Sequence, residues 1–99
     1  MALACSSTDG PVTLRVDLRT DLIPGVEFDA IRVQIDGADD LLRSEVEADW
    51  LTGARVGEWQ LAPVDLQALE LSLLLQGTPV VSRRALTSLR EDAGVTITM

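Results

Sequence analysis

The fold is decided by residues 12–19, which read Val-Thr-Leu-Arg-Val-Asp-Leu-Arg. Apolar and polar side chains alternate strictly throughout this stretch. Successive side chains of a β-strand point to opposite faces, so the alternation predicts a strand with one face buried and the other in water.

The same period of two recurs further along the chain and predicts more short strands. We expect them at residues 28–36, 42–50, 56–62, 69–75, 78–84 and 95–99. Residues 65–76 also fit a short helix, because leucine is a good helix former. The alternating leucines and the flanking turns favour a strand there.

Turn-forming residues separate the predicted strands. Pro24-Gly25 predicts a type II turn, because proline fixes φ at the second turn position and glycine permits a positive φ at the third. Gln76-Gly77 predicts a hairpin turn. About seven short antiparallel strands with turns between them are typical of an immunoglobulin-like or fibronectin-like β-sandwich. Trp50 and Trp59 fit the apolar pattern, and we expect both in its core.

Arg83 and Arg84 are adjacent in a predicted strand and must point to opposite faces. We therefore expect one of them near a sheet edge, on a bulge, or beside a carboxylate.

The charge composition argues against nucleic-acid and membrane-surface binding. The 99 residues carry 16 acidic and 8 basic side chains, for a net charge of -8. Phosphate backbones and anionic lipid headgroups would be repelled by such a chain.

This chain lacks the residues that most catalytic mechanisms need. There is no histidine, no lysine and one cysteine, which excludes histidine-based nucleophilic pairs, Schiff bases, Walker-type phosphate loops and thiolate zinc sites. The remaining groups are carboxylates, so we expect neither an enzyme nor a cofactor.

Two acidic clusters are candidate sites. Glu45, Glu47 and Asp49 share one face of the predicted strand 42–50, with neighbours ~6.6 Å apart, near the carboxylate separations of glycosidases. An alternating acidic face is normally a solvated surface, and that interpretation is favoured here.

Residues 36–40 form the best metal candidate, with Asp36, Asp39 and Asp40 as candidate calcium ligands, although no metal site is expected here. Calcium takes six to eight oxygen ligands, and this turn supplies only part of such a shell. Asp and Gly are also ordinary turn formers, which is the favoured interpretation.

The N-terminus suggests a location. Residues 2–6 read Ala-Leu-Ala-Cys-Ser, like the end of a bacterial lipoprotein signal whose cysteine becomes lipidated. The pattern is loose, since Ala2 stands where leucine is usual and the upstream parts of a signal are missing. We expect residues 1–10 to be a truncated signal end and flexible tether, with lipidation at Cys5, and residues 11–99 to be the β-sandwich domain. The alternative is a free thiol on a ragged terminus.

Residues 19–29 carry a resemblance to a known type of module. They read Arg-Thr-Asp-Leu-Ile-Pro-Gly-Val-Glu-Phe-Asp, and an alternating strand follows them. This stretch resembles the opening of β-sandwich modules in predicted secreted lipoproteins of myxobacteria-like bacteria. The resemblance covers most of residues 12–99. It implies a location in the cell envelope or outside the cell, anchored by lipid at the outer membrane or cell surface. It also implies a first module with further domains downstream, and it implies no activity.

The sequence therefore favours a non-catalytic cell-envelope module that acts as a spacer or an interaction domain. Its expected partner is an unidentified protein or surface, with membrane contact only through the lipid anchor. The alternative is a calcium- or carbohydrate-binding β-sandwich module.

Overall fold

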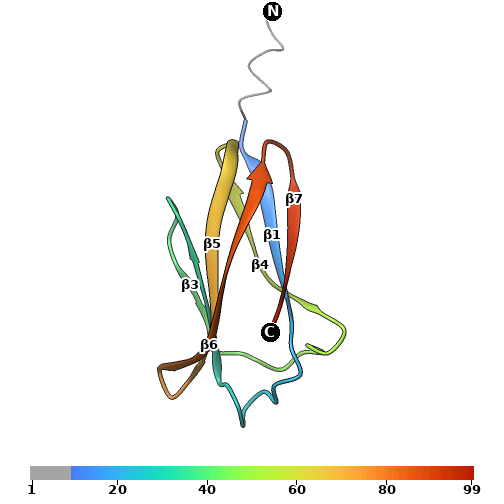
Figure 1. Cartoon of the computed structure of the whole chain (residues 1–99), viewed down its shortest axis with the longest axis vertical. Helices are drawn as coiled ribbons and strands as arrows, with labels where there is room; N and C mark the ends of the chain where they lie inside the picture. The colour runs from blue at the N-terminus through green and yellow to red at the C-terminus, as the bar shows by residue number, and fades with distance from the viewer. Residues whose placement is uncertain (1–9) are drawn as a thin grey trace, which may run out of the picture.

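The computed structural model describes residues 10–99, which form seven strands in two sheets and contain no helix (Figure 1). The strands are β1 (Val12–Arg19), β2 (Ala30–Ile35), β3 (Leu41–Arg43), β4 (Ala54–Leu61), β5 (Val64–Leu75), β6 (Thr78–Leu89) and β7 (Ala93–Thr98). The all-β prediction is confirmed, and the two-sheet arrangement is compatible with a β-sandwich.

The two sheets draw on strands from both halves of the chain. One sheet has the order β4-β1-β7 and the other has the order β3-β2-β5-β6. Every neighbouring pair is antiparallel except β1 and β7, which run parallel. The prediction of antiparallel strands is therefore wrong for this pair. The cause is the connector at residues 90–92, which crosses between the sheets at the end where β1 also begins (Figure 1).

The core lies between the inner faces of the two sheets. Leu14, Val16 and Leu18 of β1 are all 0% exposed, as the alternation of residues 12–19 predicts. The larger sheet supplies the facing residues, which are Ile31, Val33, Leu69, Leu71 and Leu73. Burial of these aliphatic side chains is the main force that holds the sheets together.

The ambiguous stretch at residues 65–76 is strand rather than helix. β5 runs without a break from Val64 to Leu75 and pairs with both β2 and β6. The two-residue alternation of leucines outweighs their helix propensity here, because it places one continuous apolar face over the core.

Both predicted turns are confirmed. Gly25 has a φ of 83°, and the Val26 amide donates to the Ile23 carbonyl at 3.2 Å, as in a type II turn. Gln76 and Gly77 have φ values of 53° and 81°, which suits the tight hairpin between β5 and β6.

The strand predicted at residues 42–50 is wrong. Its strand portion, β3, ends at Arg43, and the chain then crosses to the other sheet as an irregular segment. Val46 and Trp50 are buried at 8% and 2% exposure from this segment. The Trp50 indole Nε1–H donates to the Val46 carbonyl at 2.7 Å. The apolar residues of this segment therefore do not form one face of a sheet. Two of them, Val46 and Trp50, anchor the crossover in the core.

β6 is an edge strand, and it continues beyond the predicted residue 84 to Leu89. Arg83 lies opposite the fully buried Leu71, so it stands on the core side of the sheet at its rim. Arg84 lies opposite Glu70 on the outer face. The expected edge position of this pair is confirmed, and a charge on the inner side of an edge strand opposes pairing with a second chain.

Candidate functional site

The acidic turn at residues 36–40 lies between β2 and β3 at the end of the molecule where β1 begins. Asp36, Asp39 and Asp40 are all exposed. The turn is held by its backbone, with Gly37 at a φ of 82° and the Ala38 amide donating to the Ile35 carbonyl at 3.1 Å. Within residues 10–99, no group of three or more acidic or thiol side chains is placed to hold a metal ion.

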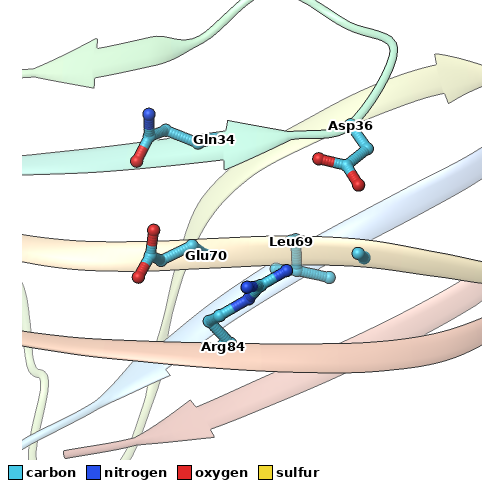
Figure 2. A pocket seen from close by; sticks show the side chains of 6 residues that line it. Gln34, Asp36, Leu69, Glu70 and Arg84 are labelled. Carbon is cyan, nitrogen blue, oxygen red and sulfur yellow. The ribbon is translucent and has the colours of Figure 1, made fainter.

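Asp36 instead lines a polar hollow of about 210 Å³ on the outer face of the larger sheet (Figure 2). The other polar residues around it are Gln34, Glu70 and Arg84. Glu70 and Arg84 are direct cross-strand partners. This arrangement of two carboxylates, an amide and a guanidinium offers hydrogen bonds to solvent or to a polar ligand.

Glu45, Glu47 and Asp49 do not form the regular acidic face expected of a strand. They lie in the crossover between β3 and β4, and all three are exposed. The carboxylate of Asp49 accepts a hydrogen bond from the Thr52 amide at 3.4 Å, which places it in a local turn. The carboxylate spacing inferred from strand geometry therefore does not apply.

The aromatic side chains belong to the core. Phe28 is 0% exposed and Trp50 is 2% exposed, while Trp59 is half-buried and packs against the same cluster. The core position of Trp50 is confirmed, and that of Trp59 is confirmed in part. Sugar binding relies on open aromatic faces, and the two buried rings do not offer one.

Cys5, the predicted lipidation residue, lies outside the described residues. Within residues 10–99, no helix has the length and hydrophobicity needed to span a membrane.

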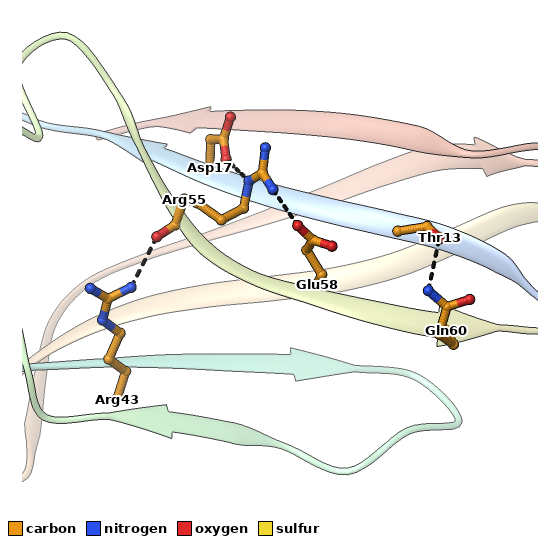
Figure 3. A network of polar contacts seen from close by, with 6 residues as sticks. All are labelled: Thr13, Asp17, Arg43, Arg55, Glu58 and Gln60. Atoms are coloured by element: carbon orange, nitrogen blue, oxygen red, sulfur yellow. Dashed lines mark hydrogen bonds and ion pairs between the residues drawn. The ribbon is translucent and has the colours of Figure 1, made fainter.

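The side chain of Arg43 links the two sheets. It leaves β3 and donates through Nη1 to the backbone carbonyl of Arg55 in β4, at 2.9 Å (Figure 3). Its Nε donates to the Glu45 carbonyl at 2.7 Å, and its guanidinium carbon lies 5.6 Å from the centre of the Trp50 ring. Sequence reasoning missed this role, because Arg43 falls on the polar side of an alternating pattern that indicates only exposure to water.

The outer face of the smaller sheet carries a polar network. Arg55 of β4 contacts the carboxylates of Asp17 in β1 and Glu58 in β4, and Gln60 donates to the Thr13 hydroxyl at 2.8 Å (Figure 3). The hydrogen bond to Asp17 is the main cause that raises the pKa of Arg55 above its ordinary value. The network links β1 to β4 on the outer face of the smaller sheet.

The first and last described strands form the most distinctive local arrangement. β1 and β7 pair in parallel from Leu14↔Ala93 to Arg19↔Thr98. At one end of this pair, the Thr13 amide donates to the Asp92 carboxylate at 2.8 Å. At the other end, the Met99 amide donates to the Arg19 carbonyl at 2.8 Å. We call these two contacts the terminal clasps of the β1–β7 pair.

Searches of protein-family models, of curated proteins and of solved structures found no match to this chain. The functional argument therefore rests on the geometry described above.

Proposed function

We propose that this chain is a non-catalytic module of the bacterial cell envelope that acts as a spacer between the elements on either side of it. The observation that carries this proposal is the parallel pairing of β1 with β7.

Parallel pairing separates the two points at which the chain meets its neighbours. Val12 and Ala93 lie at one end of the β1–β7 pair, and Arg19 and Thr98 lie at the other. The path from the start of β1 to the end of β7 therefore spans about 25 Å, at the rise of a β-strand. A polypeptide that continues on both sides would enter at one end of this pair and leave at the other, as a spacer requires (Figure 1).

We further propose that the domain has immunoglobulin-like topology. If β1 is taken as strand B, then β4 matches strand E beside it, and β3-β2-β5-β6 matches the order C′-C-F-G. β7 then takes the place of strand A beside B, but it comes from the opposite end of the chain and runs parallel to B. This correspondence supports a sandwich of the kind found in many extracellular spacer domains.

The spacer proposal predicts an extended tandem array. Two full-length copies fused end to end, with Cys5→Ser in both, should scatter X-rays as a particle close to twice as long as one copy. The single chain carrying Cys5→Ser is the control. A fused pair little longer than the single chain would mean that the copies pack side by side, and the spacer proposal would be wrong.

The location is proposed from the sequence around Cys5 and from the resemblance of residues 19–29 to modules of secreted lipoproteins. Acyl chains contribute ~0.8 kcal/mol of membrane binding for each buried CH₂, so a multiply acylated cysteine would hold the domain at a membrane.

The lipid anchor is tested by expressing the gene from its own genomic surroundings in its natural host. Labelled palmitate should enter the wild-type protein, which should sediment with membranes. Cys5→Ser should abolish both results and leave the circular dichroism spectrum unchanged. A wild-type protein that is soluble and unlabelled would contradict the proposal of a lipid anchor, and the spacer proposal would be unaffected.

A further inference from the structure

The two strands that would receive a pulling force on this domain are neighbours in one sheet. β1 begins immediately after the first described residues, and β7 ends one residue before Met99. They share an unbroken register of six residue pairs, from Leu14↔Ala93 to Arg19↔Thr98. Any tension transmitted through the chain therefore meets the β1–β7 ladder first.

The parallel direction determines how that ladder is loaded. Tension draws β1 toward its own start and β7 toward its own end, which are opposite directions along one axis. The hydrogen bonds lie across that axis and are strained together. Each single bond contributes little to stability, but in this geometry the bonds must break as a group. Antiparallel neighbours pulled from the same end would instead open one pair at a time.

The terminal clasps oppose fraying at both ends of the ladder. The contact from the Thr13 amide to the Asp92 carboxylate joins residues 79 positions apart in the chain. A hydrogen bond to a charged acceptor is stronger than one between neutral groups. The backbone contact between Met99 and Arg19 closes the opposite end.

The core also resists sliding of one strand past the other. Leu14, Val16 and Leu18 of β1 are fully buried, and Ile97 of β7 is 3% exposed. A slip of one residue would turn every apolar side chain of a strand to the solvent face. β1 is held on its other side by β4, so β7 is the strand that must move.

We infer that this domain resists mechanical tension applied along its length, with the β1–β7 pair as the mechanical lock. The inference rests on the proposed spacer function and specifies what the spacer withstands.

Single-molecule force spectroscopy of the full chain carrying Cys5→Ser tests this inference. In one attachment, the handles are fused to the two ends of the chain. In the other, they are joined through Pro11→Cys and Glu91→Cys, both exposed and both at the end where β1 and β7 begin. At equal loading rates, end-to-end pulling should require a several-fold higher unfolding force, because forced unfolding reports the barrier along the pulled direction. Equal forces in the two attachments would overturn the inference.

Asp92→Ala should lower the end-to-end unfolding force, whereas the matched control Glu91→Ala should leave it unchanged. Asp92→Asn keeps a carbonyl acceptor and should retain most of the force. Thermal melts of the three variants verify that each is folded before it is pulled. If Asp92→Ala unfolds at the wild-type force, the Asp92 clasp has no part in the lock. A compact tandem array with a preserved force difference would contradict the spacer proposal and leave the mechanical inference standing.

Discussion

Trp50→Ala is expected to remove a large share of the stability of the domain, more than either Trp50→Phe or Trp59→Ala removes. The Trp50 side chain is 2% exposed and anchors the crossover from β3 to β4 in the core. Removing a buried tryptophan costs about 3–5 kcal/mol, and small domains have only ~5–15 kcal/mol in total. The variant also loses the hydrogen bond to the Val46 carbonyl and the face on which the Arg43 guanidinium rests.

Urea denaturation followed by far-UV circular dichroism measures the loss. Trp50→Phe keeps most of the apolar volume and should be destabilised much less. Trp59→Ala removes the same side chain from a half-buried position and should also cost less. If Trp50→Ala is no less stable than Trp59→Ala, the crossover is not anchored by Trp50.

Gly57→Ala is expected to destabilise the domain by about 1–3 kcal/mol, the usual cost of overpacking. A Cβ at this position would lie 3.0 Å from both the Leu41 Cδ2 and the Trp59 Cη2 atoms. The Trp59 ring lies over the glycine on the same strand, and Leu41 reaches it from the other sheet. An added Cβ therefore requires the ends of these two side chains to shift, and the φ of Gly57 is not in the left-handed region.

Gly94→Ala is the matched control, because a Cβ there meets no atom within 4 Å. It should be neutral or stabilising by up to about 1 kcal/mol, through a less flexible unfolded chain. In the Trp59→Ala background, the cost of Gly57→Ala should fall, and the double-mutant cycle measures that coupling. Equal stabilities of Gly57→Ala and Gly94→Ala would contradict the close packing.

The alternation of apolar and polar side chains predicted a strand correctly where one face of that strand is buried and the other is exposed to solvent. Residues 12–19 and the leucines of β5 each have one face on the core and one on solvent, so a period of two is imposed on them. Residues 44–50 show the same period without a strand. There the requirement is only that Val46 and Trp50 reach the core, and two side chains four positions apart meet it in an irregular segment.

The sequence pattern did not predict which strands are neighbours in a sheet. Alternation assigns a side chain to a face, but it carries no information about which strand lies next to it. The parallel pairing of β7 with β1 and the reach of Arg43 to the Arg55 carbonyl depend on the crossovers between sheets. Glu45, Glu47 and Asp49 could be identified from sequence, and they do not share a strand face because they lie in the crossover from β3 to β4.

The pairing of β1 with β7 has a consequence for biosynthesis. During translation, β1 emerges among the first residues, but its parallel partner is complete only when Thr98 has been made. Until then, one edge of β1 has unpaired backbone groups, and the core lacks Ile97. Contacts between such distant residues slow folding, because the loop must close before they form. We therefore expect the complete fold to form only after the last strand has left the exit tunnel of the ribosome.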